Sequence, residues 1–384
     1  MAAYFDNAAT TALCGAAKAA FEKACEIYAN PSSVHSAGLE AEKLISASRK
    51  KLLSVTGGTG KGTVVFTGCG TESNALALFG AAYAKKANEK KNIIISDSEH
   101  PSVYKAAEEL KNRGFEIREV KTRGGAISAD ELSALVDDGT FLISIMTVNN
   151  ETGAEYDIKE LCRVSKAKNP RVIFHTDATQ AFMKTDTDVS VLGVDMMTLS
   201  AHKIGGPKGV GALYISDRVI RSRSVVPVLY GGGQEGGLRS GTENTAGIAA
   251  FAAAAEYGKT NFDADLSRIK EISEYIKTEL EKAGVRVNRP VRAVPHIISA
   301  SLPGIKSEVM LRYLSAEGIY ISSGSACSSH HPGISRSLQA FGLQAKEADC
   351  TVRISLWRTN TLYEAELLVE NIKTGVKSLI KIRK

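Results

Sequence analysis

The sequence predicts an α/β protein with two domains, a large one built on a mainly parallel sheet flanked by helices and a smaller α+β one. Three observations support this prediction. Short apolar runs alternate with helix-like segments between residues 60 and 215, as in a doubly wound sheet. The pattern changes after about residue 260. The length of 384 residues also exceeds that of most single domains.

Seven short runs in the first part of the chain are typical of buried strands. They are rich in β-branched residues and almost continuously apolar, as is expected of strands that are covered on both faces. These runs are TVVF (63–66), NIIIS (92–96), EIREV (116–120), FLISIMTV (141–148), RVIFHTD (171–177), MMTLS (196–200) and GALYI (211–215). Helix-like patterns lie between them, for example at 72–90 and 102–114, and the second ends at Gly114, a residue suited to a helix C-terminus.

Two further segments follow the strand-rich part. The glycine-rich segment 216–245 has no regular pattern and predicts a long loop. Long loops in compact enzymes are usually functional or interfacial. The run AGIAAFAAAA (246–255) predicts a buried, close-packed helix.

The smaller domain is predicted from a second set of elements. An amphipathic helix precedes four strand-like or helix-like runs, and together they cover 266–284, 297–302, 307–318, 319–322 and 352–357. Thr361 and Glu364 have the spacing of a capping box before the last helix. We therefore expect a large domain at 15–260, and a small domain formed by 1–14 and 261–384.

Composition argues against several classes of function. The net charge of +6 is spread along the chain, and its basic cluster, KSLIKIRK, lies at the C-terminus. We therefore expect no nucleic-acid partner, since such binding needs clustered Lys and Arg. The N-terminus MAAYFDNAAT does not resemble a targeting signal, and the longest apolar run is too short to span a bilayer. The six cysteines form no CxxC pair, which favours free thiols in the cytoplasm.

The stretch LSAHKIGGPKGVGALYI carries the strongest local signal. Lys203 follows a strand-like run and precedes a glycine-rich turn, so it lies at the edge where open α/β sheets bind ligands. Most lysines are simply surface residues. Here Ser200 and His202 crowd the amine, and a partly desolvated lysine can form a Schiff base.

Asp177 also ends a predicted strand, 26 residues before Lys203. A carboxylate at this place needs a cationic partner, which could be a nearby Arg or Lys, or the pyridinium nitrogen of a cofactor. His100 and Asn150 end two other strand regions at the same edge. Convergence at one edge favours a binding site over four unrelated structural residues.

The turn after TVVF has the features of a phosphate site. Gly68, Gly70 and Thr71 precede a predicted helix that opens at Glu72. Free backbone N–H groups and the positive end of a helix favour an anion there, although an ordinary strand–helix turn would look similar. The neighbouring GGTGKGT (57–63) lacks P-loop spacing, because Gly62 follows Lys61.

Cys327 lies in SSGSACSSHHPG (322–333), among small residues. It could be a structural thiol, a nucleophile, or a metal ligand together with His330 and His331. A second cluster with ligand spacing is not seen, so we expect no metal. Small neighbours suit a mobile loop that carries a reactive thiol.

The whole set of motifs resembles the cysteine desulfurases of the NifS/IscS type. These belong to the class V aminotransferases, which are fold-type-I enzymes dependent on pyridoxal 5'-phosphate. The resemblance runs from residue 6 to residue 361. It rests on DNAATT, NPSSVHSAG, GTESNALAL, EHPSV, VNNETG, HTDATQ, SAHKIGGPKGVGALY, GGGQEGGLRSGTEN and SSGSACSS.

The resemblance implies a role for each matching residue around the cofactor. Lys203 would bind pyridoxal phosphate covalently, Asp177 would hold its ring nitrogen, and His100 would stack on its ring. The ring hydroxyl or the substrate would contact Gln180 and Asn150. The phosphate would be held by Gly70, Thr71, Ser200 and His202, together with Thr242 from the other subunit of a homodimer.

The resemblance also implies the reaction. Arg353 would bind the carboxylate of L-cysteine through its bidentate guanidinium. The Cys327 thiolate, on a loop of the small domain, would attack the substrate sulfur and leave L-alanine and an enzyme-bound persulfide. The sulfur would then pass to an acceptor protein, such as an iron–sulfur scaffold or a thiolation carrier.

Three positions depart from the family pattern. Cys69 stands in the phosphate turn, where serine and small residues are usual. Trp357 stands where glycine is usual, and the pair His330-His331 is also unusual. Two alternatives remain open, namely a selenocysteine lyase or other enzyme of the same family, and a catalytically weak protein for sulfur transfer or scaffolding.

Overall fold

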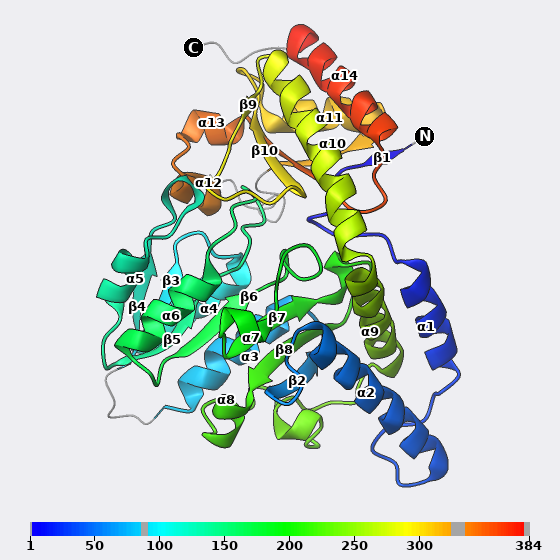
Figure 1. The fold of residues 1–384 in the computed structure, drawn as a ribbon, viewed down its shortest axis with the longest axis vertical. Coiled ribbons are helices and arrows are strands. Elements are labelled where there is room, and N and C mark those ends of the chain that lie inside the picture. The colour runs from blue at the N-terminus through cyan, green and yellow to red at the C-terminus, as the bar shows by residue number, and fades with distance from the viewer. Residues whose placement is uncertain (1, 86–90, 324–334, 380–384) are drawn as a thin grey trace.

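The computed structural model describes residues 2–85, 91–323 and 335–379. Its largest element is a seven-stranded sheet (Figure 1). The strands in their order across the sheet are β2 (Gly62–Thr67), β8 (Gly211–Ser216), β7 (Met196–Ser200), β6 (Ile173–Asp177), β5 (Thr140–Ser144), β3 (Asn92–Ser96) and β4 (Glu116–Val120). β8 is antiparallel to both of its neighbours, and all other pairs are parallel. The prediction of a mainly parallel sheet is confirmed.

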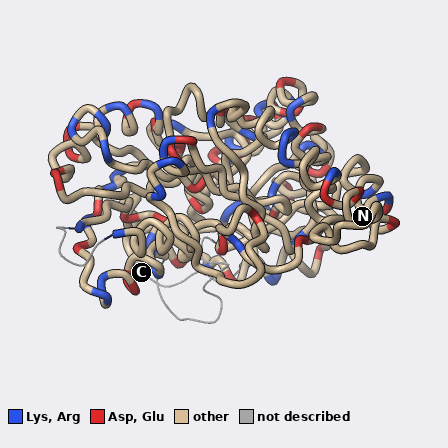
Figure 2. Tube along the Cα trace, turned by 90° about the horizontal axis from the view of Figure 1, so that it is seen from below, with Lys and Arg blue, Asp and Glu red and all other residues tan. Residues whose placement is uncertain are grey.

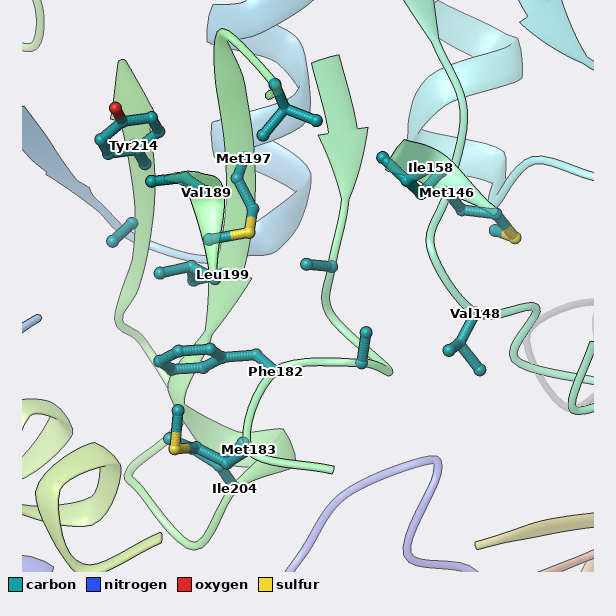
Figure 3. Close-up of a cluster of buried hydrophobic side chains, with 14 of the residues drawn as sticks. Met146, Val148, Ile158, Phe182, Met183, Val189, Met197, Leu199, Ile204 and Tyr214 are labelled. Atoms are coloured by element: carbon teal, nitrogen blue, oxygen red, sulfur yellow. The ribbon is translucent and has the colours of Figure 1, made fainter. Parts of the chain in front are cut away.

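Helices cover both faces of this sheet (Figure 1). They are α1 (Gly15–Cys25), α2 (Ser36–Val55), α3 (Gly70–Tyr83), α4 (Pro101–Asn112), α5 (Ala129–Leu135), α6 (Ile158–Lys168), α7 (Val189–Leu192), α8 (Asp217–Arg221) and α9 (Thr245–Thr260). Successive residues of a strand point to opposite faces of the sheet, so they belong to different hydrophobic clusters. Ile93 and Ile95 pack with α3 and α4, whereas Ile94 belongs to the cluster that contains residues of α2, α6 and α9. Figure 3 shows part of this second cluster around Phe182 and Leu199.

Several element bounds differ from the sequence-based expectations, and three differences concern the phosphate turn, the strand β5 and the predicted loop. α3 begins at Gly70 rather than Glu72, because Cys69 is extended (φ −173°, ψ 171°) and the helical turn starts directly after it. β5 ends at Ser144, and the chain continues buried to Val148, which forms an isolated bridge with Glu155. The segment 216–245 contains α8 and the 3-10 turn η3 (Glu235–Gly237), and both are too short to give a periodic pattern.

The remaining elements form a smaller α+β unit. Its antiparallel sheet has the order β12 (Ser322–Ser323), β13 (Thr351–Ser355), β10 (Ile297–Ser301) and β9 (Arg286–Val287). The two-residue strand β1 (Ala3–Tyr4) pairs in parallel with β11 (Ile319–Tyr320). Its helices are α10 (Phe262–Lys282), α11 (Ser307–Ala316), α12 (Arg336–Phe341), α13 (Ala345–Asp349) and α14 (Leu362–Ser378).

The two units have separate hydrophobic cores. The smaller core combines Ala3 and Phe5 with apolar residues from α10, α11, α14 and the small sheet. Asn261 ends α9 and begins α10, so the two helices follow each other from one unit into the other (Figure 1). We propose for the structure the domain division expected from the sequence, with 15–260 as one domain and 1–14 with 261–384 as the other.

The N-terminal segment after β1 joins the two units. The side-chain amide of Asn7 donates to the Ser355 carbonyl (2.9 Å), and the Ala8 N–H donates to Ser355 Oγ (2.8 Å). On the other side, Thr11 Oγ1 donates to the His202 carbonyl (2.9 Å). Residues 7–11 are therefore held by both domains at once.

Figure 2 marks charged residues of both signs along the backbone trace of the described residues. Lys and Arg alternate with Asp and Glu along the trace. This distribution suits small-molecule chemistry better than binding along a polyanion. In the part of the chain that the structure describes, no helix is both long enough and apolar enough to cross a membrane.

The capping box predicted at Thr361 is present. The Glu364 N–H donates to Thr361 Oγ1 (3.2 Å), and the Thr361 N–H donates to the Glu364 carboxylate (2.8 Å). We expect Thr361→Ala to lower the free energy of unfolding by about 1 kcal/mol, because α14 loses its N-cap. Urea unfolding followed by circular dichroism would measure this loss. Thr374→Ala, an exposed position of the same helix, is the matched control and should cost less; equal losses would contradict a capping effect.

Candidate active site

A pocket of about 360 Å³ lies at the carboxyl ends of the parallel strands, beside β13 of the small domain. Its size is within the range of cofactor and substrate sites. Ten of the twelve residues predicted for the site line it. These are Gly70, Thr71, His100, Asn150, Asp177, Gln180, Ser200, His202, Lys203 and Arg353. Met146 and Val148, labelled in Figure 3, add apolar wall on the β5 side.

Lys203 ends the short 3-10 turn η2 (Ala201–Lys203) that follows β7. Its amine donates to the carbonyls of Ala8 (2.6 Å) and Ala9 (2.8 Å). Gln180 also donates to the Ala8 carbonyl (2.9 Å). The N-terminal segment therefore fixes the lysine nitrogen at the pocket wall.

Asp177, the last residue of β6, is buried and held by two donors. Asn74 Nδ2 donates to its Oδ2 (2.7 Å), and the backbone N–H of Thr179 donates to its Oδ1 (2.9 Å). Asn74 comes from the second turn of α3, so helix and strand together orient the carboxylate. A carboxylate fixed in this way can bind a protonated ring nitrogen.

His100 is the N-cap of α4. Its Nδ1 accepts the N–H of Ser102 (3.2 Å), so the neutral ring carries its proton on Nε2. Burial lowers the pKa of His100; the nearby Lys203 acts in the same direction, against the opposing effect of Asp177. A neutral imidazole in the pocket wall can stack on a planar ring.

The opposite end of the pocket could hold a phosphate. Gly70 and Thr71 form the first turn of α3, where backbone N–H groups lack helical partners. A Cβ at Gly70 would lie 3.2 Å from Thr179 Oγ1, so a side chain there would fill the cradle. Ser200 and His202 complete this end. Burial and neighbouring lysines lower the pKa of His202 to about 4, so it is neutral at pH 7.

Arg353 enters the pocket from β13. It pairs with Asp6 (2.8 Å) and donates to the Asn150 carbonyl (2.9 Å). Its Nε is buried and has no hydrogen-bond partner among the described residues. An arginine that lines a pocket, and whose guanidinium has five N–H donors, is suited to a carboxylate ligand.

Of the other two predicted site residues, Thr242 does not line the pocket. Thr242 is exposed on the glycine-rich loop, and Arg239 of the same loop pairs with Glu72 of α3 (2.7 Å). Cys327, with His330 and His331, lies outside the described residues. In the described ranges, no group of three His, Cys, Asp or Glu could hold a metal ion.

Sequence reasoning missed several pocket residues. Asn74 and Ser102 link Asp177 to His100, since Asn74 Nδ2 also donates to Ser102 Oγ (2.8 Å). Ala8 contributes a carbonyl rather than a side chain. The motifs GTESNALAL and EHPSV contain Asn74 and Ser102, but their spacing does not show that the two side chains meet.

Comparison with known proteins identifies the family. Residues 3–368 match the family model "Aminotransferase class-V". A "NifS/IcsS protein homolog" of Lactobacillus delbrueckii subsp. bulgaricus is 40% identical, with 94% of each chain covered. The "Cysteine desulfurase IscS" of Dictyoglomus turgidum is 36% identical, over 97% of this chain and 95% of that one.

Solved structures agree with these relatives. A "NIFS-LIKE PROTEIN" superimposes with a TM-score of 0.91 at 32% identity, covering 99% of this chain and 100% of its own. A structure described as "SspA in complex with cysteine" superimposes with a TM-score of 0.79 at 31% identity, covering 93% and 99%. The protein therefore belongs to the class V aminotransferase family and, within it, to the cysteine desulfurases of the NifS/IscS type.

Proposed function

We propose that this protein is a cysteine desulfurase that uses pyridoxal 5'-phosphate to convert L-cysteine to L-alanine and leaves the sulfur as a persulfide on Cys327. The observation that carries the proposal is one pocket that combines Lys203, Asp177 and Arg353. A lysine that can hold an aldehyde, a carboxylate for a ring nitrogen and an arginine for a carboxylate suit an amino acid bound to this cofactor.

The residues present fit the cofactor. Gly70, Thr71, Ser200 and His202 would hold its phosphate, Asp177 its ring nitrogen, and His100 its ring face. Gln180 Oε1 and Asn74 Oδ1 are buried without a hydrogen-bond partner among the described residues. Buried polar atoms are nearly always paired, which supports a polar ligand beside Gln180. When bound, pyridoxal phosphate supplies an electron sink for the carbon from which the α-proton is lost.

The side chains of the pocket divide the remaining tasks. Arg353 would bind the substrate carboxylate through its guanidinium. Lys203 would move the proton at the substrate Cα, because its amine is held at the pocket wall by two carbonyls. Asn150 lines the same pocket, and its carbonyl accepts a hydrogen bond from Arg353, so it would orient the substrate.

The flanks of the Cys327 segment support its assignment as the nucleophile. The described chain stops after β12, where Ser322 pairs with Arg353. It resumes at Ser335, whose hydroxyl donates to Glu151 (2.5 Å), the neighbour of Asn150. Both flanks therefore lie beside the proposed substrate-binding residues.

The sulfur step balances without an external oxidant. The Cys327 thiolate attacks the substrate sulfur, an S–S bond forms, and the Cβ–S bond breaks. Its electron pair stays with Cβ, which takes up a proton and becomes the methyl group of L-alanine. The persulfide would be passed to an acceptor protein, for iron–sulfur cluster assembly or for another thiolation. The cytoplasmic location expected from the cysteines stays a prediction.

Cys327→Ala should abolish persulfide formation and most sulfide release, because it removes the nucleophile. Cofactor binding should persist, since no cofactor-binding residue changes, and the stability should change by no more than about 0.5 kcal/mol. Alanine and sulfide assays with purified protein would check this. Cys25→Ala, an exposed thiol on α1, is the control and should retain activity. Parental turnover by Cys327→Ala would contradict the assignment.

Lys203→Ala should lose the visible absorbance band of the covalently held cofactor, because Lys203 lines the pocket beside Asp177. Spectra after gel filtration would show this. Lys208→Ala, an exposed lysine of the same turn, should keep the band. A parent protein that stays colourless with added pyridoxal phosphate would favour a scaffold role. Turnover of selenocysteine but not of L-cysteine would favour the lyase alternative.

We also propose a homodimer in which Thr242 contacts the cofactor phosphate of the partner subunit. Its exposure away from the pocket of its own chain supports this. Thr242→Ala should weaken cofactor retention at both sites. Mixed dimers of Thr242→Ala with Lys203→Ala subunits should regain one intact site, measured as bound cofactor per dimer. A monomeric, fully active protein, or no regain on mixing, would be inconsistent with the shared site.

A further inference from the structure

The chain passes from the small core to the large core directly after β13. Val352, Ile354 and Leu356 belong to the hydrophobic cluster of the small domain. Trp357 is only 2% exposed and belongs to the cluster of the large domain. Its indole is therefore a joint between the two domains, four residues after Arg353.

Arg353, Ser355 and Trp357 lie at alternate positions, so their side chains share one side of the strand and its extension. Arg353 lines the pocket, and Ser355 Oγ accepts the N–H of Ala8. The Trp357 ring lies on the same side of the chain and contacts Lys184 in the turn that follows β6. A shift at Trp357 would thus be transmitted along the strand to Arg353.

That turn contains two further distinctive features. Met183 has φ +58°, a left-handed conformation that side-chain residues rarely adopt, and Figure 3 shows it beside Phe182 and Ile204. Lys184 follows, and it is 4% exposed. Its Nζ is buried with no hydrogen-bond partner in the described ranges. A buried ammonium without a partner is costly, so another stabilising contact is expected.

The indole supplies that contact. Lys184 Nζ lies 5.2 Å from the centroid of the Trp357 ring, and Arg358 Cζ lies 4.4 Å from it. Both distances are within the range of cation–π attraction, which is strongest away from water. A glycine at 357, as in the family pattern, would remove this contact.

The charges that face Lys184 come from several elements. Burial lowers the pKa of Lys184 to about 7, and the cations Lys203, Arg353 and Arg358 act in the same direction. His296 of the neighbouring wall has a pKa well below its usual value and is uncharged. The one acid that lines the small cavity here, among the described residues, is Asp265, which pairs with Arg358 (3.2 Å). The Trp357 ring is thus an attractive partner for the charged form of Lys184.

We propose that Trp357, packed against Lys184, is a positioning residue that fixes Arg353 at the substrate end of the pocket. The inference rests on the proposed role of Arg353 in binding the substrate carboxylate. Loss of the ring would leave Lys184 unpartnered and open a cavity at the joint, so the end of β13 would lose its packing against the large domain and Arg353 would be positioned less firmly. Cofactor binding depends on large-domain residues and would be spared.

Trp357→Gly should raise KM for L-cysteine about tenfold, with kcat changed less than threefold and the cofactor band kept. Trp357→Phe keeps an aromatic face and should stay within twofold of the parent. Trp357→Leu, which fills most of the space without an aromatic face, should behave like Trp357→Gly and replaces it if that variant does not fold. In a Lys184→Met background, replacing Trp357 should have a smaller effect, because the coupled contact is already lost.

The matched control is Phe262→Leu, which changes an apolar residue of the same small cavity; no cation of the described residues lies over the Phe262 ring. It should lower the melting temperature without raising KM. A readout without turnover is the dissociation constant of L-alanine by calorimetry, which should rise about tenfold in Trp357→Gly and Trp357→Leu. An unchanged dissociation constant, or equal effects of Phe262→Leu and Trp357→Leu, would overturn the inference. A parent that binds L-alanine in this Trp357-dependent way but does not desulfurate L-cysteine would refute the proposed function alone.

Discussion

The carbonyl of Ala8 is the contact on which the rest of the site depends. It accepts hydrogen bonds from Lys203 and from Gln180, while the N–H of the same residue donates to Ser355 of the small domain. The preceding Asp6 pairs with Arg353. One short segment thus positions the amine of one domain against the guanidinium of the other. Fixing both groups through a common backbone favours a constant distance between them, which catalysis on a bound amino acid requires.

Burial determines the charge state of the two histidines in the pocket. His100 and His202 have lowered pKa values and are neutral near pH 7, so Lys203 and Arg353 supply the positive side-chain charge. They lie toward the amine and carboxylate of the proposed substrate. The phosphate end relies instead on the N-terminus of α3 and on neutral donors. Because these two kinds of anion site lie at different ends of the pocket, a ligand with a phosphate and a carboxylate would bind in one orientation.

Much of the fold could be predicted because the strands are buried on both faces, so their sequences are continuous apolar runs. The predicted strand at 92–96 matches β3 to the residue. α8 and η3 were missed, since helical segments of five residues or fewer complete too few turns to show a helical period. Lys203 and Asp177 could be inferred from strand ends, but the carbonyl of Ala8 and the bond from Asn74 to Asp177 could not. Such contacts depend on how distant segments meet, which residue type and spacing do not encode.

Trp357 also shows the difference between what the residue type reveals and what only the contacts in the structure reveal. Its identity is conspicuous in the sequence, as the single tryptophan where the family pattern has glycine. Its meaning appears only when Lys184, 173 positions earlier, is found against its ring. A desulfurase with glycine at this position would have to hold its small domain by other contacts. In this chain the lysine and the indole are each difficult to bury alone, and together they form a joint that neither domain could provide by itself.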